Sequence, residues 1–254
     1  MIVSLAGKGG SGKTALAALL LKEAIQDPSR RVLVIDADSS MGLPYALGVE
    51  VAKTVGDVRE RIIKEPKRRK EVMDLPILEV VSEALQPGPG FDLLVMGRGE
   101  GPGCYCGIND LLKYGIDTLS KQYDLTIVDG EAGPEQVSRR VLSKVDNLVI
   151  VSDTSRRGLH TARLIWDVAS GGLLARGAHL GVVINRIRPE TAGMAAQALQ
   201  MGMELWGCVP ADDELSASDT NGIPLLKLSD TSPAFLSVRE LARQIGLSPV
   251  TSGG

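Results

Sequence analysis

Gly7-Lys8-Gly9-Gly10-Ser11-Gly12-Lys13-Thr14 separates an apolar run at residues 2–5 from a helical pattern at residues 15–26. The stretch matches the phosphate-binding pattern G-x-x-x-x-G-K-[ST] in its required place, after a strand and before a helix. Its glycines allow positive φ angles, so several backbone N–H groups and the positive end of the helix can point at phosphate oxygens. This P-loop therefore predicts a nucleotide site at the end of the first strand.

The loop residues have separate predicted roles. Lys13 neutralises charge on the β- and γ-phosphates and is a catalytic candidate, while the Thr14 hydroxyl can ligate Mg²⁺. The residues expected to line the nucleotide are Gly9, Gly10, Ser11, Gly12, Lys13, Thr14 and Ala15. The alternative is a glycine-rich turn that binds no ligand.

Strand and helix patterns alternate along the 254 residues, as in a parallel α/β sheet. Short apolar runs predict strands at 2–5, 32–35, 93–96, 125–128, 148–151 and 180–184. Helical periodicity predicts helices at 15–26, 108–121, 159–169 and 234–245, and glycine and proline predict a functional loop at 87–107. We expect one domain over residues 1–254, with a mostly parallel central sheet and helices on both faces.

Composition limits the function classes. The 28 basic and 31 acidic residues give a net charge of -3, which provides no overall basic field for nucleic acid or anionic membrane. The basic run at 67–70 is interpreted as a solvated helix face. Three cysteines cannot form a disulfide framework, the chain opens in an apolar run without a basic leader, and no apolar run reaches membrane-spanning length. We expect a cytoplasmic protein without nucleic-acid or membrane partners.

A second lysine, Lys8, precedes the P-loop glycines. This resembles the deviant P-loop of the SIMIBI ATPases, which include the Min and Par ATPases, nitrogenase iron protein and several metallocentre maturation factors. In those families the matching lysine reaches across a dimer to the partner's nucleotide. The resemblance implies an ATP-dependent homodimer in which Lys8 acts catalytically in trans; the alternative is a solvated loop lysine.

Two acidic segments lie at predicted strand ends, where α/β sheets place ligands. The segment at 35–38 resembles switch I of this group, which implies that Asp38 orients the attacking water and that Asp36 supports Mg²⁺. The segment at 128–133 resembles Walker B and switch II, which implies that Asp129 holds Mg²⁺ and that the Gly133 N–H senses the γ-phosphate. A helix cap is the alternative for a strand-end aspartate.

Base recognition is expected at Asn185, which follows the run at 181–184. In the ATPases that this chain resembles, an asparagine there contacts the adenine edge, helped by backbone near Pro210. No N-K-x-D guanine signature is present, because the run continues as Asn185-Arg186-Ile187-Arg188. ATP is therefore preferred over GTP, and a strand-ending turn is the alternative role of Asn185.

Cys104 and Cys106 stand two residues apart in a glycine-rich stretch. Residues at this spacing face the same way only in extended or turned chain. Two thiolates leave a metal ion short of four ligands, and a two-fold dimer would supply the missing pair. Ni²⁺, Zn²⁺, Cu⁺ or an iron-sulfur cluster would suit such a site; buried or redox cysteines are the alternative. Cys208 is interpreted as a core residue.

Several motifs together resemble the nickel-insertion ATPases of carbon monoxide dehydrogenase and acetyl-CoA synthase maturation, the CooC and AcsF types. They are Gly103-Cys104-Tyr105-Cys106, Asn109, Leu111-Leu112, Lys8, Asp129-x-Glu131-Ala132-Gly133 and the segment at 154–163. The resemblance implies an ATPase that binds Ni²⁺, or Zn²⁺, between two subunits and serves apo carbon monoxide dehydrogenase or acetyl-CoA synthase. Ser39 stands where a proline commonly follows the second aspartate, a departure that bears on hydrolysis rate more than on binding.

Three other functions remain as alternatives. A Min-like positioning ATPase would need a basic amphipathic C-terminal helix, but Arg239 and Arg243 are offset by Glu240. A Par-like ATPase would need a basic stripe, for which only residues 67–70 qualify. An iron-sulfur reductase component would carry a cluster on separated cysteines. His160 and His179 are interpreted as structural or surface residues.

Overall fold

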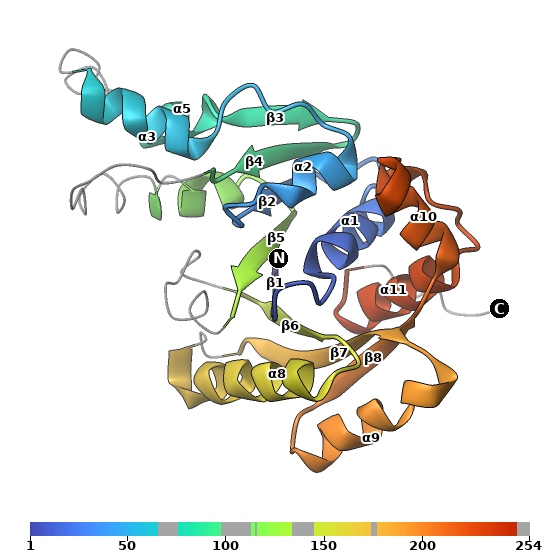
Figure 1. The fold of residues 1–254 in the computed structure, drawn as a ribbon. Helices are drawn as coiled ribbons and strands as arrows, with labels where there is room; N and C mark the ends of the chain where they lie inside the picture. The colour runs from blue at the N-terminus through green and yellow to red at the C-terminus, as the bar shows by residue number, and fades with distance from the viewer. Residues whose placement is uncertain (66–75, 98–112, 115, 134–144, 174–176, 248–254) are drawn as a thin grey trace.

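One eight-stranded sheet runs through the protein, in the order β3-β4-β2-β5-β1-β6-β7-β8. The computed structural model describes residues 1–65, 76–97, 113–114, 116–133, 145–173 and 177–247 (Figure 1). All neighbouring strands are parallel except β3, which pairs antiparallel with β4. The strands are β1 (Ile2–Gly7), β2 (Val32–Asp36), β3 (Leu85–Gly88), β4 (Phe91–Val95), β5 (Leu125–Ala132), β6 (Asn147–Ser152), β7 (His179–Ile187) and β8 (Leu205–Pro210).

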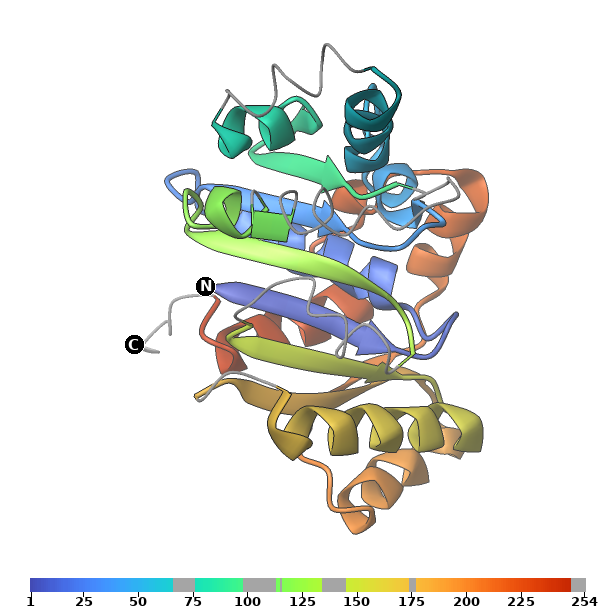
Figure 2. The same ribbon diagram turned by 90° about the vertical axis from the view of Figure 1, so that its left-hand side faces the viewer.

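Helices cover both faces of this sheet, which confirms the predicted fold class (Figures 1 and 2). They are α1 (Lys13–Ala24), α2 (Gly42–Leu47), α3 (Val55–Lys64), α5 (Ile77–Ser82), α8 (Arg156–Val168), α9 (Gly193–Gln200), α10 (Asp213–Asn221) and α11 (Pro233–Gln244). A π-helical turn at Ala169–Leu173, short 3-10 helices at Pro189–Thr191 and Leu225–Lys227, and helical residues at 113–114 and 116–120 complete the described helical segments. Among the described helices, none combines the length and apolar character that a bilayer crossing requires.

The pleat of each strand divides its side chains between two cores. Val32 and Val34 of β2 join the core beneath α1, α2 and α11, whereas Leu33 and Ile35 join the core beneath α3 and α5. All five residues of β2 are buried, as expected for a strand between two helical layers. Further along the sheet, α8 and α9 pack over β6 and β7 on the second face.

The helix that follows the P-loop is the most deeply enclosed. Leu16, Leu19, Leu20 and Leu21 of α1 are at most 1% exposed, and they lie on different sides of the helix. Because α1 contacts the sheet, α2 and α11 at once, apolar residues are needed all round it. This packing fixes the first turn of α1, and therefore the P-loop, against the carboxyl end of β1.

The loop predicted for residues 87–107 is wrong in its first part. Pro87 and Gly88 belong to β3, which pairs with β4 through Pro87 opposite Asp92 and Gly88 opposite Phe91. Pro87 is tolerated because β3 is the edge strand of the sheet, where a missing N–H leaves no ladder bond unmade. Residues 98–107 lie outside the described part, as does the basic run at 67–70.

Several boundaries also shift. The helix predicted at 159–169 begins at Arg156, because the Ser155 hydroxyl accepts a hydrogen bond from the Gly158 N–H and so caps α8. The helix predicted at 108–121 is helical at 113–114 and 116–120, and its remaining residues up to 112 lie outside the described part. Helices α2, α3, α5, α9 and α10 were not predicted; most are short or weakly periodic.

Candidate nucleotide-binding site

The P-loop joins the carboxyl end of β1 to the first turn of α1. Gly10 and Gly12 have φ angles of 77° and 94°, which side chains rarely adopt. A Cβ atom at Gly12 would lie 2.1 Å from Nδ2 of Asn185, so a side chain there would both strain the backbone and displace Asn185. The Ser11 N–H donates to the Lys8 carbonyl at 3.1 Å and closes the turn. The predicted loop is thus present in the structure.

Lys13 and Asp129 form the buried polar centre of the site. Burial lowers the pKa of Lys13, and the carboxylates of Asp129 and Asp38 oppose that shift. The Lys13 Nζ atom lies 3.4 Å from the Lys8 carbonyl oxygen. This ammonium group therefore lies where the loop encloses it, with acidic side chains nearby to favour its charged form.

Asp129, toward the carboxyl end of β5, is 1% exposed, and neither carboxylate oxygen makes a hydrogen bond of ordinary geometry with a described residue. Burial raises its pKa to about 7; the Thr14 hydroxyl and Lys13 oppose the rise, and Asp36 and Asp38 add to it. A buried carboxylate without a partner is costly unless a cation or a proton compensates. Together with the Thr14 hydroxyl it offers hard oxygen ligands, the kind that Mg²⁺ prefers. The residues present therefore fit a magnesium ion.

Asp36, at the end of β2, is fully buried and engaged with its own segment. Its Oδ1 accepts the Asp38 N–H and its Oδ2 accepts the Leu43 N–H, both at 3.0 Å. Burial raises its pKa to about 6, although both backbone bonds lower it. Asp36 thus shapes the segment at 36–43, and this segment places Asp38 at the edge of the cavity that faces the P-loop.

Two further predicted residues are held by contacts within the chain. The Nζ atom of Lys8 lies 2.6 Å from Oδ2 of Asp153, which follows β6. The Gly133 N–H, predicted to sense the γ-phosphate, donates to the Gly7 carbonyl at 3.0 Å. Asp153 also accepts the Ser155 N–H at 3.1 Å, so it ties Lys8 to the cap of α8.

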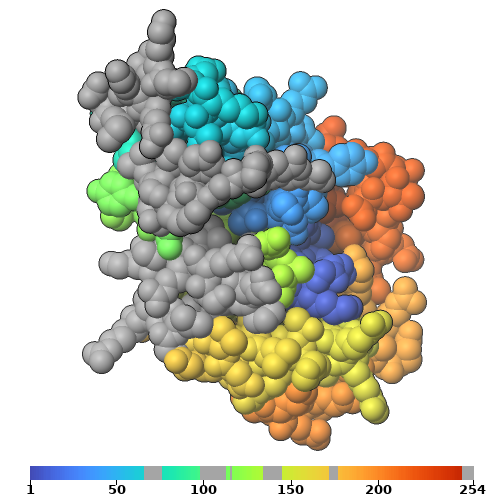
Figure 3. Space-filling model, turned by 60° about the vertical axis from the view of Figure 1, so that its left-hand side comes forward, coloured from blue at the N-terminus to red at the C-terminus, as the bar shows by residue number. Residues whose placement is uncertain are grey.

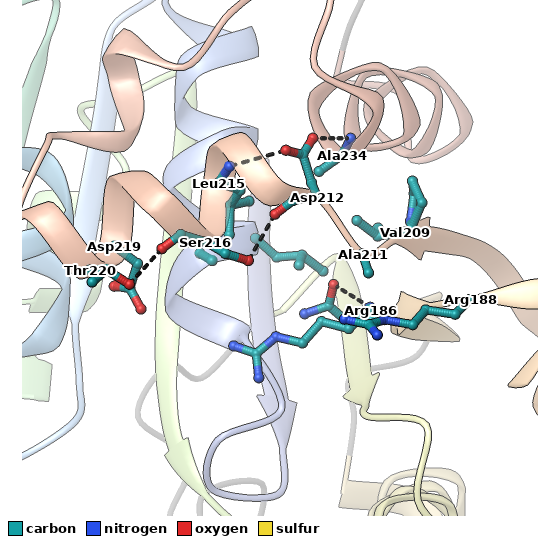
Figure 4. A pocket seen from close by; sticks show the side chains of 14 residues that line it. Arg186, Arg188, Val209, Ala211, Asp212, Leu215, Ser216, Asp219, Thr220 and Ala234 are labelled. Carbon is teal, nitrogen blue, oxygen red and sulfur yellow. Dashed lines mark hydrogen bonds between the residues drawn. The ribbon is translucent and has the colours of Figure 1, made fainter.

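Two cavities open along the P-loop and the start of α1. The first, of about 340 Å³, is lined by the P-loop and by the segment at 36–43, including Lys13, Thr14 and Asp38. The second, of about 220 Å³, is lined by the ends of β7 and β8 and by α10 (Figure 4). In Figure 3 the dark-blue N-terminal segment reaches the surface between light-green atoms near the end of β5 and the yellow atoms of α8.

Asn185 lies between the second cavity and the P-loop, and it contacts both. Its Nδ2 donates to the Ser11 carbonyl at 2.8 Å, and its Oδ1 accepts the Arg186 N–H at 2.9 Å. The side chain is 5% exposed and lines the second cavity with Pro210. Asn185 and Pro210, both predicted near the base, thus line one cavity, but the sequence did not indicate that Asn185 also contacts the P-loop.

The CobQ/CobB/MinD/ParA nucleotide binding domain matches residues 2–225 of this chain. The chain belongs to this family. An uncharacterized ATP-binding protein of Methanocaldococcus jannaschii is 40% identical over 250 residues, covering 96% of this chain and 98% of that protein. The carbon monoxide dehydrogenase accessory protein CooC of Rhodospirillum rubrum is 29% identical over 248 residues, covering 92% of this chain and 91% of that protein.

Solved structures agree with this family at the level of the fold. The MinD cell division protein of Aquifex aeolicus superposes with a TM-score of 0.71 at 20% identity, covering 98% of both chains. The septum site-determining protein MinD of Pyrococcus horikoshii, solved with Mg-ADP, superposes with a TM-score of 0.68 at 22% identity, covering 96% of this chain and 95% of that chain. The resemblance to CooC-like SIMIBI P-loop NTPases is confirmed.

The predicted metal ligands Cys104 and Cys106 lie outside the described residues. Among the residues that the structure does describe, no group of three or more His, Cys, Asp or Glu side chains could hold a metal ion. Cys208 lies in β8, half-buried against the core below α8 and α9, and burial raises the pKa of its thiol. His160 and His179 are exposed, in agreement with a surface role.

Three residues of this MinD/ParA-family site were not predicted. Asp153 pairs with Lys8, and Arg186 and Asp219 line both cavities. Arg186 has a φ angle of 60°, unusual for a side chain with a Cβ atom, and its Nη1 lies 3.4 Å from the Gly10 carbonyl. The position of Asp153 directly after an apolar strand was the available signal, because β6 ends beside β1.

Proposed function

We propose that the protein is an ATP-dependent metallochaperone that binds nickel between two subunits through Cys104 and Cys106. Its client would be apo carbon monoxide dehydrogenase or acetyl-CoA synthase. The observation that carries the proposal is the 29% identity to CooC over 92% of this chain, combined with the Cys-x-Cys sequence. The P-loop and the two cavities beside it would supply the nucleotide part of that activity.

In the proposed complex the phosphates of ATP occupy the first cavity and the base occupies the second. Thr14 and Asp129 would hold Mg²⁺, which neutralises phosphate charge when bound. Support comes from the partnerless carboxylate oxygens of Asp129 and from the MinD relative solved with Mg-ADP. Asn185 and the backbone near Pro210 would then contact the adenine edge.

The chain's own groups account for hydrolysis. Lys13 binds the β- and γ-phosphates from its enclosed position, and Asp38, at the cavity edge, orients the attacking water. The Gly133 N–H leaves the Gly7 carbonyl to bind the γ-phosphate. Lys8 leaves Asp153 and reaches the nucleotide of a second subunit, so that ATP stabilises the homodimer.

Nickel is the cargo of this cycle. Each subunit offers two thiolates, and two subunits offer four, the number that closes a site for Ni²⁺ or Zn²⁺. Helical residues 113–114 and 116–120 precede β5, which carries Asp129. A short covalent route therefore connects the cysteine segment to the nucleotide site, and hydrolysis would release the ion to the client through it.

The test is an anaerobic Ni²⁺ titration with mass determination in solution, with and without ATP. We expect about one Ni²⁺ per dimer, lost in a Cys104→Ala/Cys106→Ala variant and kept in a Cys208→Ala variant. Absence of nickel binding in the wild type, or equal binding in the double variant, would contradict the proposal. A Zn²⁺ titration on the same three proteins measures the selectivity between the two ions.

A Min-like positioning ATPase is the less supported candidate. Its membrane helix would need an unpaired basic amphipathic face, whereas α11 packs Val238 and Leu241 into the core and its arginines pair with Glu23 and Glu240. Binding to anionic vesicles, as a function of salt, would detect such an activity.

A further inference from the structure

The two cavities of the nucleotide site share one section of wall. Ala15, Arg186, Leu215 and Asp219 line both of them. A nucleotide with its phosphates in one cavity and its base in the other must therefore place its ribose beside these four residues. Ala15 and Leu215 are apolar, so any polar recognition at this junction falls to Arg186 and Asp219.

Asp219 is the acceptor available at the junction. It is an exposed residue of α10, and its carboxylate has no hydrogen bond or ion pair with any residue that the structure describes. Nearby hydroxyls on the same helix are already committed: the Ser216 hydroxyl donates to the Asp212 carbonyl at 2.8 Å, and the Thr220 hydroxyl donates to the Ser216 carbonyl at 2.9 Å (Figure 4).

The negative charge of Asp219 determines which chemical group of a nucleotide can lie beside it. An ionised carboxylate only accepts hydrogen bonds, and it repels phosphate oxygens. Its partner must therefore be an uncharged group that donates, and ribose hydroxyls are the donors that lie between base and phosphates. Arg186, which reaches from the end of β7 toward the Gly10 carbonyl, supplies the positive charge suited to the phosphate side of the same junction.

We propose that the Asp219 carboxylate accepts hydrogen bonds from the ribose hydroxyls of the bound nucleotide and makes the site select ribonucleotides over deoxyribonucleotides. This inference rests on the proposed function, since it requires ATP as the ligand. It adds a specificity-determining residue, because Asp219 contacts the sugar and not the reacting phosphate.

The experiment compares the affinities for ATP, 2′-deoxy-ATP and 3′-deoxy-ATP in Mg²⁺ buffer, measured by calorimetry or by displacement of a fluorescent nucleotide. Removing Asp219 also removes a negative charge that repels the triphosphate, but this contribution cancels in the ratio of ATP to deoxy-ATP affinity. The wild type is expected to favour ATP over at least one deoxy analogue by about tenfold, the scale of one hydrogen bond to a charged group.

In Asp219→Ala this ratio falls to about one, and in Asp219→Asn, which keeps one acceptor oxygen, it takes an intermediate value. The matched control is Asp213→Ala, which removes the same charge from an exposed position of α10 that lines neither cavity. Its ratio stays at the wild-type value. Unfolding midpoints of all four proteins verify that the helix is intact.

The outcomes separate this inference from the proposed function. If the wild type binds neither ATP nor its analogues, the proposed function fails. If ATP binds but the wild-type ratios are near one, or if Asp219→Ala keeps the wild-type ratios, ATP binding stands and the role of Asp219 is wrong.

Discussion

The Nζ atom of Lys8 lies 2.6 Å from Oδ2 of Asp153 within one chain. Both side chains are partly accessible, at 32% and 21% exposure. An ion pair of this kind contributes at most about 1 kcal/mol to stability. It can nevertheless decide where Lys8 points, because a lysine held by its own subunit is not available to a partner.

Asp153→Asn should therefore strengthen ATP-dependent dimerisation. If Lys8 reaches the second subunit as proposed, it would no longer lose an ion pair in this variant, and we expect a dimer dissociation constant lower by about threefold to fivefold. Analytical ultracentrifugation with a non-hydrolysable ATP analogue measures this constant. Asp167→Asn, which removes the exposed Arg163 pair on α8, is the control and should leave it unchanged. Equal or weaker dimerisation of the Asp153 variant would contradict this role of the ion pair.

Asp129→Asn should stabilise the ligand-free protein at alkaline pH. The folded-state pKa of Asp129, about 7, lies above its ordinary value of 3.8. Its contribution to stability is therefore fully present below pH 3.8 and is lost as pH rises through about 7. In EDTA we expect the variant to be more stable than the wild type by about 1–3 kcal/mol at pH 8, with the difference shrinking toward pH 5. Urea unfolding at several pH values measures it.

Asp124→Asn should change the pH dependence of stability in the opposite direction to Asp129→Asn. Hydrogen bonds from the backbone and side chain of Arg31 lower the pKa of Asp124, so its stabilising contribution is present above the ordinary pKa and is lost at acid pH. This variant should lose stability at pH 8 relative to the wild type. A stability difference for Asp129→Asn that does not change with pH would contradict the burial argument.

Gly12→Ala should destabilise the P-loop by a clash that depends on Asn185. The new Cβ atom would lie 2.1 Å from Asn185 Nδ2, and φ would remain at 94°. We expect a loss of about 2–4 kcal/mol in unfolding free energy and loss of measurable ATP binding. In an Asn185→Ala background the same substitution should cost about 1–2 kcal/mol, because the clash is gone and only the backbone strain is left. Strictly additive losses would show that the contact is unimportant.

Thr14→Val should weaken ATP binding only when Mg²⁺ is present. Valine keeps the shape of the side chain but lacks the hydroxyl that would ligate the ion, so we expect about tenfold weaker ATP binding in Mg²⁺ and little change in EDTA. Thr161→Val on α8, whose hydroxyl donates to the Arg157 carbonyl, is the control. Equal loss with and without Mg²⁺ would assign Thr14 a packing role instead.

The sequence predicted those parts of the site that depend on local order along the chain. The P-loop was recognisable because a strand, a glycine-rich turn and a helix follow one another within residues 2–24. Asp36, Asp129 and Asn185 were found because each directly follows a run of buried apolar residues, toward the carboxyl end of its strand. Parallel pairing then brings these ends to one edge of the sheet.

The features that were not predicted depend on which strands are neighbours in the sheet, which the order of residues along the chain does not reveal. Asp153 meets Lys8 only because β6 pairs with β1, although the two residues are 145 positions apart. Asp219 enters the site from α10, a helix whose polar sequence shows little apolar periodicity. Strand β3 was missed because Pro87 and Gly88 are typical of turns, and only its place at the sheet edge makes them acceptable.

The hydrogen bond from the Gly133 N–H to the Gly7 carbonyl would, in the proposed function, make the site distinguish ATP from ADP. This N–H can serve the terminal phosphate only by abandoning a bond worth about 1 kcal/mol, so the change is an exchange of acceptors. A charged γ-phosphate oxygen is a stronger acceptor than a carbonyl and wins the exchange, whereas ADP has no oxygen to offer at that place. In the proposed function, the junction of β1 and β5 would therefore be closed with ADP and parted with ATP, so that a third phosphate would separate two strand ends.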